Sequence, residues 1–207
     1  MTALLVIAKA PRAGHSKTRL CPPCTPPQAA ALARAALADT LEAVRATPAS
    51  RHVLVLDGDP GDWLPPGFEV LPQRGGGLDE RLANAFDDVA CPALLIGMDT
   101  PQVTPRALCD GLEALAEPRI DAVLGPAPDG GYWAIGLREP DPSVFLGVPM
   151  SSARTCRAQR ARLSQLGLRV RELSALRDVD RIADAHAVAA LAPTGRFARV
   201  LALTGAA

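Results

Sequence analysis

The chain alternates short apolar runs with longer segments in which apolar residues recur every three or four positions. The short runs are typical of strands, and several are continuously apolar, as in strands that are covered on both faces. These runs are LLVIA (4–8), HVLVL (52–56), FEVL (68–71), ALLIG (93–97), DAVLG (121–125), YWAIGL (132–137) and LRVREL (168–173).

The longer segments are expected to be helices. Thr25 and Gln28 form a capping box with proline in the first turn, and Gly167 is placed to end a later helix. The expected helices cover 26–46, 79–89, 104–117, 151–167 and 181–191. This alternation predicts an α/β fold, a mostly parallel mixed sheet with helices on both faces, formed by one domain over 1–207. Ligands of such folds bind at the carboxyl ends of the strands.

Composition narrows the function classes. The 207 residues are 48% hydrophobic and 21% charged, and 22 basic residues balance 22 acidic ones. This balance argues against disorder and against general nucleic-acid binding. No apolar run is long enough to span a membrane, and the first basic residue follows the first apolar run, unlike a signal peptide. We therefore expect a cytoplasmic protein without a membrane partner. The CPPC at 21–24 has no second cysteine pair, so a rigid loop is favoured over a redox or metal site.

The segment KAPRAGHSKTRL (9–20) follows the first expected strand. A Walker A loop is excluded, because Pro11 and Ser16 stand where it requires glycines. The segment nevertheless carries four cations, Lys9, Arg12, Lys17 and Arg19. It fits a polyphosphate that is neutralised by side chains, and the alternative is a solvated basic loop.

Acidic residues follow three later strands. Asp99 could bind a divalent cation or cap the next turn, since Mg²⁺ takes one or two carboxylates plus phosphate oxygens. Asp129 opens a DGG turn that brings backbone close to a ligand or simply closes a hairpin. Asp178 and Asp180 share one side of an extended segment, and Asp180 is expected to cap the last helix. Ser151 and Ser152 are expected to cap the expected helix over 151–167.

Five motifs together identify a resemblance: KAPRAGHSKTRL, GGGLDERLANAF, LLIGMDTPQV, DAVLGPAPDGGYWAIGL and DVD. Over residues 3 to about 192 the chain resembles a large bacterial family of formerly unknown function, associated with arsenosugar or selenium glycosyltransferases. Its first loop and helix are also similar to the guanylyltransferases of deazaflavin-cofactor biosynthesis. The resemblance implies a glycosyltransferase-A-like fold, that of the nucleotide-diphospho-sugar transferases. Two departures are Met150-Ser151-Ser152, where the family commonly has Trp-Ser-Thr, and the CPPC stretch.

The resemblance also implies a set of site residues. Lys17 and Asp99 would be catalytic, and Asp99 with Asp178 or Asp180 would bind Mg²⁺ or Mn²⁺. The implied nucleotide-binding residues are Lys9, Pro11, Gly14, Lys17, Thr18, Arg19, Asp79 and Arg81. The implied acceptor-binding residues are Asp129, Gly130, Gly131, Tyr132, Ser151 and Ser152.

The expected function is metal-dependent transfer from a nucleotide by a monomer or homodimer. The first hypothesis is nucleotidyl transfer from a nucleoside triphosphate to a small phosphorylated or phosphonate acceptor, with release of pyrophosphate. The second is glycosyl transfer from a nucleotide sugar. The third is a nucleotide-binding relative without catalysis. A loop with four cations favours the first hypothesis, because a triphosphate carries more charge than a diphosphate.

Overall fold

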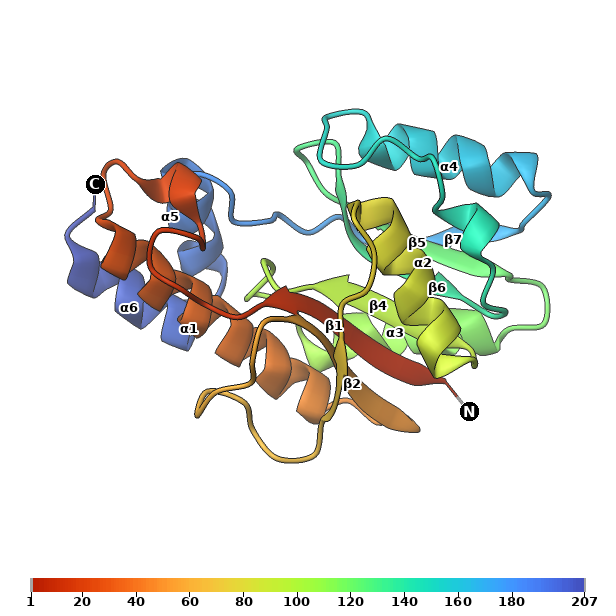
Figure 1. Ribbon diagram of the computed structural model, residues 1–207, viewed down its shortest axis with the longest axis horizontal. Helices are drawn as coiled ribbons and strands as arrows, with labels where there is room; N and C mark the ends of the chain where they lie inside the picture. Colours follow the sequence, from red (N-terminus) through yellow and green to blue (C-terminus); the bar gives the residue numbers. More distant parts are fainter. Residues whose placement is uncertain (1, 207) are drawn as a thin grey trace.

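A computed structural model describes residues 2–206, whose seven strands form one mixed sheet (Figure 1). Across the sheet the strands lie in the order β3-β2-β1-β4-β6-β5-β7. Strand β6 runs antiparallel to both of its neighbours, and the other adjacent pairs are parallel. The strands are β1 (Ala3–Lys9), β2 (Arg51–Asp57), β3 (Glu69–Pro72), β4 (Ala93–Gly97), β5 (Ala122–Pro126), β6 (Tyr132–Leu137) and β7 (Val170–Glu172). The predicted fold class is confirmed.

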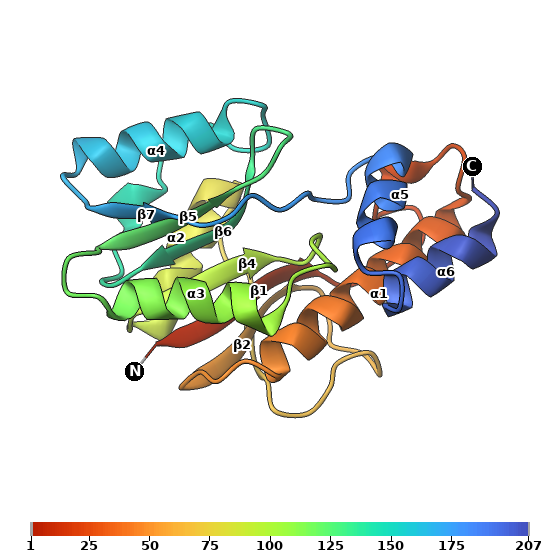
Figure 2. The ribbon, with the colours of Figure 1, turned by 180° about the vertical axis from the view of Figure 1, so that it is seen from behind.

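Helices cover both faces of the sheet (Figure 2). They are α1 (Pro26–Arg45), α2 (Leu78–Val89), α3 (Pro105–Ala116), α4 (Thr155–Gln165), α5 (Ile182–Leu191) and α6 (Arg196–Thr204), with short 3₁₀ turns η1 (Thr18–Leu20) and η2 (Pro142–Val144). Alternate residues of β1 serve the two faces. Leu5 packs in the core with Phe86 of α2, whereas Leu4 packs with Leu41 of α1 and Leu108 of α3. This two-sided burial explains why the strands are continuously apolar.

Local signals located most elements correctly. Thr25 and Gln28 form the predicted capping box at α1, and the predicted strands all exist, although β7 is shorter than LRVREL. Helix α6 was missed. It has only nine residues, and its apolar side is buried with Leu32 of α1 through Phe197 and Leu201, a contact that sequence periodicity does not reveal.

Two predicted helix caps are wrong. Helix α4 begins at Thr155, because Ser151 has a left-handed φ of 54° and the Ser152 hydroxyl accepts a hydrogen bond from Arg154 N within the preceding turn. Asp180 does not cap α5 either. The residue before that helix is Arg181, and Asp180 is held by a different partner, described below.

An extended segment, the C-terminal strap (residues 173–181), links β7 to α5. It runs past the carboxyl ends of β5 and β4 and fastens to them by hydrogen bonds. These join Leu173 N to Leu124 O (3.0 Å), Leu176 N to Pro126 O (3.2 Å), Gln102 Nε2 to Arg177 O (2.7 Å) and Val179 N to Asp99 O (2.9 Å). The strap leads to a group of helices, α1, α5 and α6, at one end of the molecule (Figures 1 and 2).

Among residues 2–206, no helix combines the length and the apolar character that a membrane span requires.

Candidate active site

A cleft with a volume of about 660 Å³ lies at the carboxyl ends of the central strands. Its lining residues come from the ends of β1 and β4, which we call the floor, from the DGG turn and the 150–155 loop, which we call the wall, from α2 and from the C-terminal strap. Of the residues that were predicted to act, those lining it are Arg19, Asp99, Asp129, Gly131, Tyr132, Ser151, Ser152, Asp178 and Asp180. The fold thus brings three distant acidic motifs to one place.

Asp99, on this floor, forms an ion pair with Lys17, which does not itself line the cleft. Lys17 Nζ lies 2.8 Å from Asp99 Oδ1, and the Lys17 side chain is only 10% exposed while that of Asp99 is 43% exposed. The same ammonium group donates to the carbonyl oxygen of Val179 in the strap. Asp99 Oδ1 is buried and makes no well-aligned hydrogen bond with the described residues, so the charge of Lys17 is what stabilises it there.

Asp178 lies beside this pair and accepts a hydrogen bond from the Thr100 hydroxyl, at 3.0 Å on Oδ1. Burial, together with the nearby charges of Asp99 and Asp129, raises the pKa of Asp178 to about 6, against the opposing effects of Thr100 and Lys17. A carboxylate in this environment is short of positive charge.

This shift predicts how stability depends on pH in the metal-free protein. The folded chain holds a proton on Asp178 up to a pKa of about 6, above the ordinary value of 3.8. Between these values the folded state binds more protons than the unfolded state, so the free energy of unfolding should fall as pH rises from about 4 to about 6. Asp178→Asn should remove this fall. Urea unfolding from pH 4 to 7.5 would measure it, and a constant difference between the two proteins would contradict the assignment.

The donor set fits a divalent cation at Asp99 and Asp178. Both carboxylates line the cleft, and Mg²⁺ binds one or two carboxylates together with substrate phosphates. Residues 2–206 contain no group of three or more acidic, histidine or cysteine side chains arranged to hold a metal ion. A cation here would therefore take its remaining ligands from substrate and water.

Asp180 fits this role less well. Both of its carboxylate oxygens accept hydrogen bonds from Arg19 Nη1, each at 3.0 Å. The pair bridges the first loop and the C-terminal strap. Of the two late carboxylates that were predicted to complete a metal site, the geometry favours Asp178.

The wall of the cleft is built around the DGG turn. Gly131 N donates to Asp129 Oδ1 at 2.8 Å, which holds the turn, and Gly130 adopts a φ of 92°. A Cβ atom at Gly130 would overlap the backbone of Ala153, so glycine lets the two loops of the wall touch. The Tyr132 hydroxyl donates to Gln159 Oε1 at 3.3 Å, and burial raises the tyrosine pKa, so it stays neutral.

Most predicted nucleotide-binding residues lie on segments next to the cleft. Lys9 is exposed at the end of β1, Gly14 and Thr18 are exposed in the loop that follows, and Pro11 is half-buried. Asp79 in the first turn of α2 accepts from Gly147 N at 3.1 Å, and Arg81 contacts Asp57 at 2.9 Å. These contacts brace the fold, and a role in nucleotide binding stays a prediction for all of these residues.

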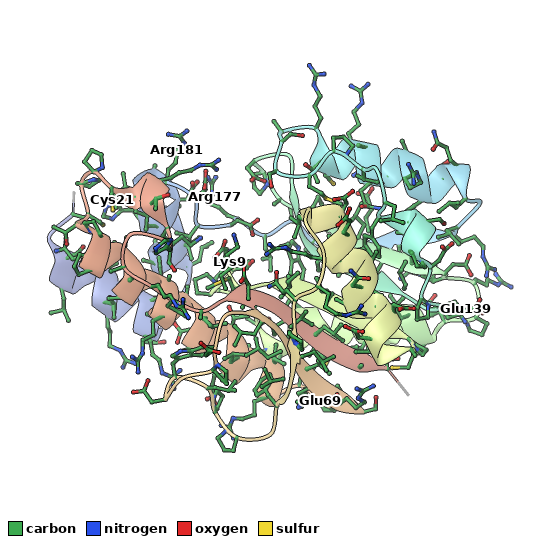
Figure 3. The ribbon with its side chains drawn as sticks, in the orientation of Figure 1. Lys9, Cys21, Glu69, Glu139, Arg177 and Arg181 are labelled. Carbon is green, nitrogen blue, oxygen red and sulfur yellow. The ribbon has the colours of Figure 1, made fainter. Side chains whose placement is uncertain are left out.

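Sequence reasoning missed several residues that line the cleft. Arg181 lies there on the strap, and Leu78 and Leu82 reach it from α2. The two leucines belong to the GGGLDERLANAF motif, but only Asp79 and Arg81 of that motif were predicted to act. The leucines and Arg181 enter the site through the packing of α2 and the path of the strap, which no local pattern reveals. Figure 3 shows Arg177 and Arg181 on the segment that leads into α5, above the edge of the sheet where Lys9 ends β1.

Known structures share this fold. The chain superimposes on a candidate nucleotide-diphospho-sugar transferase from Desulfovibrio desulfuricans G20 with a TM-score of 0.85 and 28% identity, covering 98% of this chain and 93% of that one. It also shares the fold of a 2-C-methyl-D-erythritol 4-phosphate cytidylyltransferase from Thermus thermophilus (TM-score 0.58, 18% identity, 93% and 100% covered). A third is a CMP:2-keto-3-deoxy-manno-octonic acid synthetase in complex with CTP (TM-score 0.60, 13% identity, 93% and 98% covered).

A family model described as "Uncharacterized protein conserved in bacteria (DUF2064)" matches residues 29–152. This range includes Asp99 and the DGG turn and ends at Ser152, before the C-terminal strap. No curated protein matches the chain.

Proposed function

This chain belongs to the DUF2064 family, and we propose that it is a metal-dependent transferase acting on a nucleotide. The observation that carries this proposal is the cluster at the floor of the cleft. A buried lysine and two carboxylates, Lys17, Asp99 and Asp178, meet at the carboxyl ends of the central strands. The 28% identical relative, named as a candidate nucleotide-diphospho-sugar transferase, supports the transferase class.

Nucleotidyl transfer is the reaction that we favour. An acceptor oxygen would attack the α-phosphorus of a nucleoside triphosphate, the α–β phosphoanhydride bond would break, and pyrophosphate would leave. The first loop supplies cations for the phosphates. Its ion pairs Arg12–Asp59 (3.5 Å) and Arg19–Asp180 (3.0 Å) join arginines whose side chains are 60% and 66% exposed. Such exposed pairs contribute little, so either arginine can exchange its carboxylate for a phosphate.

The residues at the floor would hold and position the reactants. Asp99 and Asp178 would bind Mg²⁺ or Mn²⁺, which neutralises charge on the phosphates when it is bound. Lys17 would stabilise the negative charge that builds on the leaving phosphate. The DGG turn and the 151–152 loop would form the acceptor side. Positioning and electrostatics supply most of the rate in such transfers.

Glycosyl transfer from a nucleotide sugar is the second candidate, and the name of the Desulfovibrio relative favours it. Product analysis separates the two. The chain would be assayed with Mg²⁺ or Mn²⁺ against a panel of nucleoside triphosphates with phosphorylated acceptors, and against nucleotide sugars. Pyrophosphate release supports nucleotidyl transfer. Nucleoside diphosphate release from a sugar donor, without pyrophosphate from any triphosphate, would replace it with glycosyl transfer.

Arg181 is proposed to bind the anionic group of the acceptor. It is exposed, lines the cleft, and forms no ion pair with any carboxylate among residues 2–206, whereas the other arginine lining the cleft, Arg19, is paired with Asp180. A hydrogen bond to a charged group is worth about 1.5–3 kcal/mol. Arg181→Met should therefore raise the KM for a phosphorylated acceptor by at least about tenfold.

Arg177→Met is the matched control for this variant. Arg177 lies on the same strap but pairs with Asp184 at 2.9 Å. Its loss should leave the acceptor KM within about twofold, as expected for an exposed pair. Steady-state kinetics with both substrates would measure this, and an Arg181→Met effect on the triphosphate KM alone would move Arg181 to the nucleotide side.

A further inference from the structure

Charged and apolar side chains of the cleft come from different parts of the fold. The charged ones belong to the first loop, the turns after β4 and β5 and the strap, and we call them the charged end: Arg19, Asp99, Asp129, Asp178, Asp180 and Arg181. The apolar ones are Ile7, Leu78, Leu82, Leu95 and Met150, of which all but Leu78 belong to one hydrophobic core cluster or pack against it, and we call them the apolar end. Phosphates and a metal ion require only the first end. The apolar end therefore needs a separate explanation.

The apolar end is part of the folded framework. Ile7 and Leu95 come from the adjacent strands β1 and β4, and Leu82 of α2 is only 2% exposed. Leu78 stands one turn earlier and is 40% exposed. The hydrogen bond from Gly147 N to Asp79 Oδ2 (3.1 Å) fastens the first turn of α2 to the segment that leads to Met150. Figure 1 shows the start of α2 beside the loop that precedes α4. The surface is thus preformed.

An uncharged occupant fits this end. The five side chains offer no charged group and no hydrogen-bond donor, so none of them can bind a phosphate or a metal ion. An apolar group would gain by covering Leu78 and Met150, the first exposed and the second half-buried. This surface includes Ile7 of β1, but it continues to the acceptor side through Met150, which precedes Ser151 and whose sulfur accepts a hydrogen bond from the Tyr132 hydroxyl at 3.7 Å.

We propose that the acceptor is a small amphiphile. Its anionic head would lie at the charged end, near Arg181, and an apolar body of several carbon atoms would lie on Leu78, Leu82 and Met150. The head group rests on the proposed function, because it is the phosphorylated or phosphonate group of the acceptor. The proposal of an apolar body rests on the residues of the apolar end alone.

The experiment measures binding and requires no turnover. The intact chain would be titrated calorimetrically with n-alkyl phosphonates from propyl to octyl, and in parallel with n-alkanols of the same lengths. Burial of one methylene is worth about 0.8 kcal/mol, so affinity should rise about fourfold per carbon atom in both series. Leu78→Asp should reduce this gain to less than about twofold per carbon atom, because it places a charge at the apolar end.

Leu203→Asp is the matched control, because Leu203 on α6 is 86% exposed and does not line the cleft. It should keep the fourfold gain. Affinity that does not change with chain length in the wild type, or a gain that survives in Leu78→Asp, would overturn the proposal. Loss of alkyl binding on saturation with a nucleoside triphosphate would also overturn the proposal, because it would show that the nucleotide occupies the apolar end.

The two series separate this proposal from the function on which it rests. Tighter binding of phosphonates than of alkanols of equal length supports both the site for the anionic head and the binding of the alkyl chain at the apolar end. If the two series bind equally and the gain with chain length is intact, the apolar end is still a binding site for alkyl chains. The phosphorylated acceptor would then be removed from the proposed function.

Discussion

Asp99→Asn is expected to lower the rate of transfer by on the order of 10³-fold, the size of effect seen when one preorganised electrostatic contact is removed. The substitution keeps the size of the side chain and removes its charge. Asp99 is the partner of Lys17 at 2.8 Å and one of two carboxylates that fit a divalent cation. The variant should therefore lose both the bound cation and the position of Lys17.

Two measurements check this prediction. Turnover would be followed by product release, and Mn²⁺ affinity by electron paramagnetic resonance titration of the free ion. Asp59→Asn is a matched control, since Asp59 also pairs with a cation of the first loop but is 94% exposed. It should keep turnover within about twofold. An Asp99→Asn protein with unchanged Mn²⁺ affinity would remove Asp99 from the metal site, and unchanged turnover would remove it from catalysis.

Gly130→Ala is expected to lower the free energy of unfolding by about 2–3 kcal/mol. Two causes add at this position. The φ of 92° disfavours any side chain, and the new Cβ would overlap the backbone of Ala153. Relief of the overlap requires the DGG turn and the 150–155 loop to separate, so the acceptor wall of the cleft should also be disturbed.

Gly67→Ala isolates the first cause. Gly67 has a similar φ of 97°, and no atom lies within 4 Å of the position of its Cβ. Its substitution should cost about 1 kcal/mol from the backbone alone. Urea unfolding of both variants would measure the difference. Equal losses of stability would show that the two loops do not press together at Gly130.

Much of the fold follows from local patterns. Continuous apolar runs predicted strands buried on both faces, and alternate residues of β1 do pack on opposite layers, as Leu4 and Leu5 illustrate. Thr25 and Gln28 determine the start of α1 through hydrogen bonds between residues close in sequence. Such signals are reliable because the interacting groups are near neighbours. Helix α6 was missed because its apolar side is buried mainly by contacts with α1, which is distant in sequence, and with α5, which is a separate helix. Neither contact can be read from the periodicity of α6 itself.

The candidate site was predictable only in part. A carboxylate that ends a strand of an α/β sheet must lie at the ligand-binding edge, so Asp99 and Asp129 could be expected to meet there. Their partners could not be derived. The ion pairs Lys17–Asp99 and Arg19–Asp180 join residues separated by 82 and 161 positions. The first pair joins the loops that follow β1 and β4, which are adjacent parallel strands, and the second exists because the C-terminal strap returns across the strand ends.

The sequence by itself therefore determined the α/β fold, the order of its strands along the chain and the set of charged residues at the strand ends. Hydrophobic periodicity and capping act over a few residues, and both can be recognised without tertiary structure. Only the tertiary structure decided which charges pair, that Asp178 lies near Asp99 while Asp180 pairs with Arg19, and that α2 supplies apolar side chains to the same cleft. Those outcomes depend on the path of the strap and on helix packing, which bring together groups that no local interaction relates.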